Sequence, residues 1–164
     1  MKSKESHQRY CIDTSSLVNL HRWRPARSHP KAWRGLGSLI DDDRLIAPRA
    51  VLSELGRRED ALVTWARGHT SMFRRHTPEI VTSVSAIVKR FPDLIDINAA
   101  KDSADPFVEA LARVESTLID EITVVTDEKF APGRSRIPHV CQAFRLRYLS
   151  MHQLFIFEGW PFDE

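Results

Sequence analysis

The stretch YCIDTSSLVNLHRW, residues 10–23, combines a short apolar segment with an acidic residue at its end. Residues 10–13 are aromatic or β-branched in character, which predicts a buried strand, and a helix is expected from about Ser15 to Trp23. Asp13 lies between them, and its carboxylate is well suited to cap the helix by accepting hydrogen bonds from free N–H groups. A second interpretation, compatible with the first, is that Asp13 belongs to a cluster of carboxylates from distant segments.

Strands and helices are expected to alternate along the rest of the chain. Further strands are predicted at residues 44–48, 121–126 and around 143–148, and further helices at residues 33–40, 49–58, 59–67, 77–91 and 104–118. Asp105, which precedes Pro106, is expected to be the N-cap of the last of these helices. The acidic turn DDD, residues 41–43, precedes a strand and is expected to be solvated. This order predicts a three-layer α/β/α domain with a mainly parallel central sheet.

Length and composition set broad limits. The chain has 164 residues, enough for one domain, expected at residues 10–164 after a polar tail of residues 1–9. It carries 24 Lys and Arg against 22 Asp and Glu, a balance that excludes neither an acidic nor a neutral substrate. Cys11 and Cys141 lie in apolar segments and are expected to be buried, reduced thiols. With no apolar run near the roughly 20 residues that span a bilayer, a soluble, cytoplasmic protein without a membrane partner is expected.

Acidic residues recur at strand ends and in early helical turns, at Asp13, Glu54, Asp105 and the pair Asp127/Glu128. Ligands of parallel sheets bind beyond the carboxyl ends of the strands, so these side chains are expected to converge if the strands are neighbours. Unpaired carboxylates repel one another, and a divalent cation removes that cost. Oxygen ligands without His or Cys at ligand spacing select a hard ion, Mg²⁺ or Mn²⁺. Such a site suits phosphodiester hydrolysis by a metal-activated water.

The stretches YCIDTSSLVNL, RLIAPRAVLSELGRRED, KDSADPFVEALA and VVTDEK resemble, in this order, the motifs of the PIN domain superfamily, the nuclease fold of VapC-type bacterial toxins. The resemblance covers nearly the whole chain from Tyr10. It implies that Asp13, Glu54 and Asp105 are metal ligands. For the fourth ligand it implies Glu128, where the family usually has Asp, with Asp127 as the alternate. Thr14, Ser15 and Thr126 would orient the carboxylates by donating hydrogen bonds.

The segment 21–34 is basic and contains two tryptophans. Phosphates are contacted by Lys or Arg and unpaired bases stack on aromatic rings, so this segment is a candidate RNA-binding rim. The alternative is a solvated helix whose tryptophans anchor the core or an antitoxin-type partner. The candidate RNA contacts here and near the fourth acid are Arg22, Arg24, Arg27, Lys31, Arg34, Arg134 and Arg136. The acids Asp93, Asp96, Asp102 and Glu109 are expected to be surface groups.

Two functions follow as hypotheses. The first, implied by the resemblance, is a metal-dependent endoribonuclease, the toxin of a type II toxin–antitoxin pair, with RNA as substrate, a cognate antitoxin as partner and homodimers as a possible assembly. The second is a PIN-fold module that binds RNA or protein through a weakened metal site, suggested by Glu128. A phosphatase of the haloacid dehalogenase type ranks last, because its second Asp is replaced by Ser15.

Overall fold

A computed structural model of the chain describes residues 8–94, 104–117, 120–130, 132–133 and 135–164. Its strands are β1 (Arg9–Ile12), β2 (Leu45–Pro48), β3 (Phe73–Arg74), β4 (Ile122–Val125) and β5 (Tyr148–Leu149). They form one sheet in the order β3-β2-β1-β4-β5, and every neighbouring pair is parallel. The predicted α/β fold with a parallel central sheet is confirmed.

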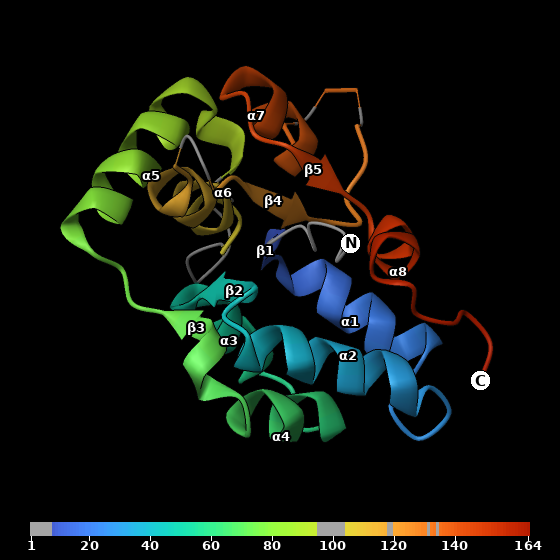
Figure 1. The fold of residues 1–164 in the computed structure, drawn as a ribbon. Coiled ribbons are helices and arrows are strands. Elements are labelled where there is room, and N and C mark those ends of the chain that lie inside the picture. Colours follow the sequence, from blue (N-terminus) through green and yellow to red (C-terminus); the bar gives the residue numbers. More distant parts are fainter. Residues whose placement is uncertain (1–7, 95–103, 118–119, 131, 134) are drawn as a thin grey trace.

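Helices cover both faces of this sheet. They are α1 (Thr14–Trp23), α2 (Pro30–Asp41), α3 (Arg49–Leu55), α4 (Ala61–Arg67), α5 (Pro78–Arg90), α6 (Asp105–Glu115), α7 (Ile137–Ala143) and α8 (Met151–Glu158), with short 3₁₀ turns at Thr70–Met72 and Pro92–Leu94. Figure 1 shows the sheet close to end-on, with α5 and α6 on one face and α1, α2 and α8 on the other. The arrangement is that of a three-layer domain.

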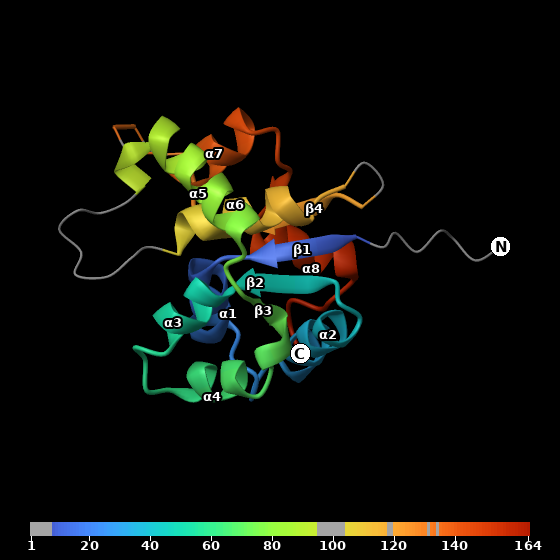
Figure 2. The same ribbon diagram turned by 90° about the vertical axis from the view of Figure 1, so that its left-hand side faces the viewer.

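The central strands are buried on both faces, as expected for a parallel sheet between two helical layers. All residues of β2 and β4 are buried, and their sequences LIAP and ITVV are continuous apolar or β-branched runs. In the β1–β4 pair, Ile12 lies opposite Val125, so the two strands end side by side. In Figure 2 the arrowheads of β1 and β2 point to the same edge, where α1 and α3 begin. Residues that follow β1 and β4 therefore meet at one edge.

The sequence prediction is wrong in part of the C-terminal third. A strand was expected around residues 143–148, whereas α7 ends at Ala143 and residues 144 and 145 form a turn in which Arg145 has a φ of 57°. The strand β5 contains only Tyr148 and Leu149, and helices that were not expected, α7 and α8, flank it. The two-residue edge strand β3 was also missed. The buried, free cysteines Cys11 and Cys141 and the exposed turn 41–43 agree with the predictions.

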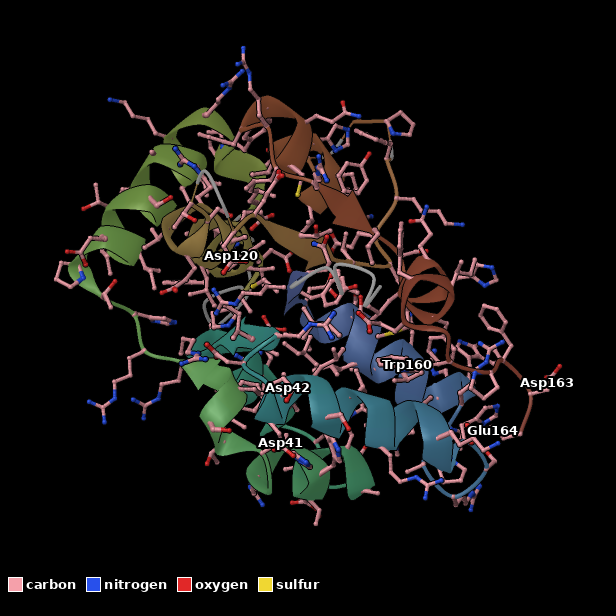
Figure 3. The ribbon with its side chains drawn as sticks, viewed as in Figure 1. Asp41, Asp42, Asp120, Trp160, Asp163 and Glu164 are labelled. Atoms are coloured by element: carbon pink, nitrogen blue, oxygen red, sulfur yellow. The ribbon has the colours of Figure 1, made fainter. Side chains whose placement is uncertain are left out.

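The last residues of the chain pack along α1 and α2. Figure 3 shows Trp160, Asp163 and Glu164 following α8 along this side of the molecule. The carboxylate of Glu164 accepts hydrogen bonds from the backbone N–H groups of Lys31 and Ala32, at 2.6 and 3.4 Å, and so satisfies the free donors at the start of α2. The indole ring of Trp160 lies directly over Gly35 in the middle of α2. The C-terminal segment is thus part of the packing of α2.

The substitution Gly35→Ala is expected to lower the free energy of unfolding by about 1–3 kcal/mol, because its Cβ would overlap the Trp160 ring. Gly37→Ala is the matched control in the same helix. Its Cβ would meet only His69, at 3.8 Å, so the better helix propensity of Ala is expected to stabilise the protein by up to about 1 kcal/mol. Urea denaturation of both variants measures the difference. Shifts of the same sign would contradict this account of the packing.

Candidate functional site

Asp13 lies where β1 passes into α1, and it fulfils both interpretations of the opening stretch. It is the N-cap of α1, with its Oδ1 accepting a hydrogen bond from the Ser16 N–H at 2.8 Å. Its Oδ2 accepts hydrogen bonds from the hydroxyl groups of Ser15, at 2.8 Å, and Thr126, at 2.6 Å. Thr126 follows the neighbouring strand β4. Asp13 is therefore held by its own helix and by a residue 113 positions away.

Burial dominates the electrostatics of Asp13. Its side chain is only 1% exposed, and removal from water raises its pKa from the ordinary 3.8 to about 6, although the hydrogen bonds from Ser16, Thr126 and Ser15 act in the opposite direction. A buried carboxyl group with this many fixed donors is oriented before any ligand arrives.

Asp105 is the point at which the predicted acids come together. Burial is the largest cause that raises its pKa to about 8, followed by the negative charges of Glu128, Asp13 and Glu54, and by a side-chain hydrogen bond with Glu128. Each of these acids comes from a different segment of the chain. We call Asp13, Glu54, Asp105 and Glu128 the carboxylate cluster.

The predicted capping role of Asp105 is wrong. Asp105 is the first residue of α6, and the N-cap position belongs to Ala104, whose side chain makes no capping hydrogen bond. The carboxylate of Glu54, near the end of α3, instead accepts a hydrogen bond from the Ala104 N–H at 2.6 Å. Glu54 thus connects α3 to the start of α6, and the Asp105 carboxyl group is directed to the cluster rather than to its own helix.

Glu128 and Asp127, the two candidates for the fourth acid, face different neighbours. Glu128 bonds to Asp105 and accepts a hydrogen bond from the Ile137 N–H at 3.0 Å, at the start of α7. The Asp127 carboxylate accepts hydrogen bonds from the Asn19 side chain, at 3.2 Å, and from the Met151 N–H, at 2.9 Å. The structure therefore brings Glu128 into the cluster and places Asp127 against α1 and α8.

The hydroxyl groups predicted to orient these acids behave differently from one another. Ser15 and Thr126 both donate to Asp13, and the Thr126 Oγ1 also accepts a hydrogen bond from the Glu128 N–H at 3.1 Å. Thr126 thereby links the first and fourth acids. The Thr14 hydroxyl group is buried and has no hydrogen-bond partner among the described residues, so it does not hold Asp13.

The donor set of the cluster fits a hard divalent ion, since it consists of carboxylate oxygens alone. In the arrangement described for residues 8–94, 104–117, 120–130, 132–133 and 135–164, no three His, Cys, Asp or Glu side chains surround a common point closely enough to hold an ion. The Asp105 and Glu128 carboxyl groups instead bond to each other. To bind an ion, these two side chains would have to exchange their contact with each other for contacts with the ion.

Glu109 is a fifth carboxyl group beside the cluster, and its predicted surface position is wrong. It lies one turn after Asp105 in α6, is 0% exposed, and neither of its carboxyl oxygens has a hydrogen-bond partner among the residues that the structure describes. Burial raises its pKa well above the usual range, and the charges of Asp105, Glu128 and Asp13 add to this effect. Its spacing from Asp105 is the sequence signal that could have predicted its burial. Residues four apart share one helix face, and the face of α6 that carries Asp105 is buried.

The basic residues predicted to contact RNA lie in several different environments. The Arg24 guanidinium group lies 5.7 and 5.4 Å from the ring centroids of Phe155 and Phe162, and its Nε donates to the Phe162 carbonyl, so it anchors the C-terminal segment. Arg136 is the N-cap residue of α7, and its Nε is buried with no hydrogen-bond partner in the described part of the chain. The other described candidates are exposed: Arg22, Arg27, Lys31 and Arg34. Arg134 lies outside the described residues.

Of the other acids predicted to lie on the surface, the structure describes only Asp93. Asp93 is exposed and accepts a hydrogen bond from the Ser135 N–H at 2.6 Å, in agreement with a surface position. Asp96 and Asp102 lie outside the described residues.

The two tryptophans of the basic segment differ in exposure. Trp23 is 71% exposed, whereas Trp33 is buried and its Nε1 donates to the Arg24 carbonyl at 2.8 Å.

The chain belongs to a family whose model is described as a domain of unknown function, DUF4411, which matches residues 10–162. The match includes the whole carboxylate cluster. A comparison with curated proteins found no match. No helix in the described part of the chain is long and apolar enough to cross a membrane.

The raised pKa of Asp105 predicts how stability depends on pH. Between its ordinary pKa of 3.8 and about 8, the folded chain holds a proton that the unfolded chain releases. In EDTA, the stabilising effect of this proton is therefore expected to be lost as the pH rises toward 8, and Asp105→Asn is expected to weaken this decline because an amide does not titrate. Urea denaturation across this range measures it, with Asp42→Asn in the exposed turn as the charge-matched control. Equal slopes for both variants would contradict the assignment.

The unpartnered carboxyl group of Glu109 is expected to cost stability. Glu109→Met, which replaces it with an apolar side chain of similar length, is expected to raise the free energy of unfolding by about 1–3 kcal/mol at neutral pH. Glu115→Met, at the exposed end of the same helix, is the control and is expected to change it by less than about 0.5 kcal/mol. A destabilised Glu109→Met variant would show that the carboxyl group has a partner in solution.

Proposed function

We propose that the protein is a metal-dependent endoribonuclease that hydrolyses RNA phosphodiester bonds at the carboxylate cluster. The observation that carries the proposal is the set of charges that raise the pKa of Asp105: they come from Asp13, Glu54 and Glu128, the residues that the PIN-like motifs select. Assembling these acids at the carboxyl edge of a parallel sheet is costly unless they bind a cation. Mg²⁺ or Mn²⁺ bound there would supply an activated water and neutralise charge on the phosphate.

The residues of the chain have separable roles in this proposal. Asp13 is a rigid ligand, because three fixed donors orient its two oxygens. Asp105 and Glu128 would act as ligands once their mutual hydrogen bond is broken, and Glu54 positions the start of α6 and places its charge near Asp105. Thr126 keeps the first and fourth acids in register by bonding to both segments.

Substitution of the acids tests the proposal. With Mn²⁺, the purified protein is expected to cleave single-stranded RNA, and EDTA, Asp13→Asn or Asp105→Asn is expected to reduce the rate by at least about a hundredfold, the scale of losing charged active-site groups. Cleavage of a labelled RNA on denaturing gels measures this rate. If EDTA and Asp13→Asn both left cleavage unchanged, the nuclease proposal would fail.

The fourth acid can be identified in the same assay. Glu128→Gln is expected to impair cleavage more than Asp127→Asn, because the Asp127 carboxylate is engaged by Asn19 and α8 rather than by the cluster. The thermal unfolding midpoint with and without Mn²⁺ gives a second readout, since an ion that binds only the folded state raises it. A larger loss from Asp127→Asn, in both cleavage and the Mn²⁺ shift, would exchange the two assignments.

The biological setting proposed here is a toxin of a type II toxin–antitoxin pair in the cytoplasm, controlled by a cognate antitoxin and able to form homodimers. It is the setting that the PIN-like motifs imply. Sequencing of RNA fragments from cells that express the wild type or Asp105→Ala tests it. Fragment ends present only with the wild type support the proposal, and identical ends in both argue against catalysis.

A PIN-like module that binds RNA or protein without cleaving is the second candidate. It is favoured by the absence, within the described residues, of three acids around a common ion position, and by Glu128 where an Asp is usual. Isothermal titration with Mn²⁺ separates the candidates. No binding at millimolar metal, with RNA binding retained, would favour the module.

A further inference from the structure

A cavity of about 510 Å³ lies at the opposite end of α1 from Asp13. It is bordered by α1, the loop that leads to α2, α2 itself and α4. Its aromatic side chains are Trp33 and Trp65, whose rings meet edge to face with centroids 5.0 Å apart. Its basic side chains are His21, Arg22, Arg27 and Arg58. We call it the Trp–Arg cavity.

The charge of the cavity comes chiefly from Arg22 and Arg27. Arg58 is neutralised by Asp60, which accepts its hydrogen bonds at 2.9 and 2.7 Å, and the His21 ring lies 3.9 Å from the same carboxylate. Arg22 and Arg27 are exposed and have no acidic partner within 4.0 Å in the described part of the chain. Two cations free for an anionic ligand thus stand beside an aromatic wall.

We propose that the Trp–Arg cavity binds an unpaired nucleotide of single-stranded RNA, with its base against the tryptophan-lined wall and its flanking phosphates on Arg22 and Arg27. A nucleotide matches this cavity because it joins a flat ring to an anion, and aromatic rings and guanidinium groups are the side chains that bind the two parts. The volume lies within the roughly 300–1,000 Å³ of ligand-binding pockets.

The position of the cavity relates it to the carboxylate cluster. Asp13 caps the start of α1 and Arg22 lies near its end, nine residues later, so the helix spaces them by roughly 14 Å along its axis. Arg58 of the cavity lies four residues after Glu54 of the cluster, in the loop that follows α3. The cavity and the first acid of the cluster therefore lie at the two ends of α1. The choice of RNA as ligand rests on the proposed nuclease function, whereas the stacking and charge arguments do not.

Binding of RNA in EDTA tests the proposal without requiring catalysis. The probe is a fluorescein-labelled, unstructured decamer of uridine or adenosine, and its anisotropy is measured over a range of salt concentrations with the full chain. The pair Arg22→Gln/Arg27→Gln is expected to weaken binding about tenfold or more and to reduce the slope of log affinity against log salt by about 1.4, as for two lost phosphate contacts on a single strand. Both residues are exposed, so this variant is expected to fold.

Two further variants complete the test. Arg75→Gln/Lys89→Gln removes the same charge from exposed positions away from the cavity and is expected to change neither affinity nor slope appreciably. Trp65→Leu, with Trp65→Phe as the conservative substitution, is expected to weaken binding while leaving the salt slope unchanged, because stacking involves no counterions. Competition with adenosine monophosphate distinguishes the two sources of the ligand. Displacement only by oligonucleotides assigns the cavity to RNA, and displacement by the mononucleotide at equal concentration overturns the RNA assignment.

The outcomes separate this proposal from the nuclease proposal. Wild-type affinity in the Arg22→Gln/Arg27→Gln protein would overturn the cavity assignment, even if the protein cleaves RNA, and would leave the cavity to an acidic, aromatic peptide of a protein partner. Cavity-dependent binding by a protein that shows no cleavage with Mn²⁺ would instead refute the nuclease proposal and keep the cavity as an RNA site.

Discussion

The rest of the site depends on the hydrogen bond from Thr126 to Asp13. It exists because β1 and β4 are adjacent, parallel and end at the same level, with Ile12 opposite Val125. A buried carboxyl group at this point would be costly without donors, and the hydroxyl groups of Ser15 and Thr126 together with the Ser16 N–H supply them. Sheet order thus determines which residues can hold the first acid.

A second consequence is that several carboxyl groups meet at the position proposed for a cation. Asp105 has a side-chain hydrogen bond with Glu128, and burial, followed by the charges of Glu128, Asp13 and Glu54, raises its pKa. Glu109, one helical turn later in α6, adds a further buried carboxyl group that has no hydrogen-bond partner within the described ranges. A core designed for stability alone would not place these groups together, and such departures from local rules are typical of functional sites.

Much of the fold could be predicted from the sequence because its main elements carry strong local signals. The apolar segments at β1, β2 and β4 and the capped helix after Thr77 are of this kind. The strands β3 and β5 have only two residues each, too few for any periodicity. In α8 the sequence MHQLFIFE has apolar residues on every side, including the exposed Ile156 and Phe157, and so no amphipathic pattern marks it. These elements depend on tertiary contacts.

The site shows the same division. The acids at strand ends can be predicted from the sequence, because parallel strands bring their carboxyl ends to one edge of the sheet. The direction in which each carboxylate points is decided by packing. Asp127 faces α8, a helix not expected from the sequence. The Arg24 side chain points to Phe155 and Phe162 rather than to the surface that the other basic residues share. Once Arg24 is accounted for in this way, Arg22 and Arg27 are the cations left beside the Trp33–Trp65 pair. Since α1 is a single helix that runs from Asp13 to Arg22, its length sets the distance between the proposed catalytic site and the Arg22 side of the proposed nucleotide-binding site.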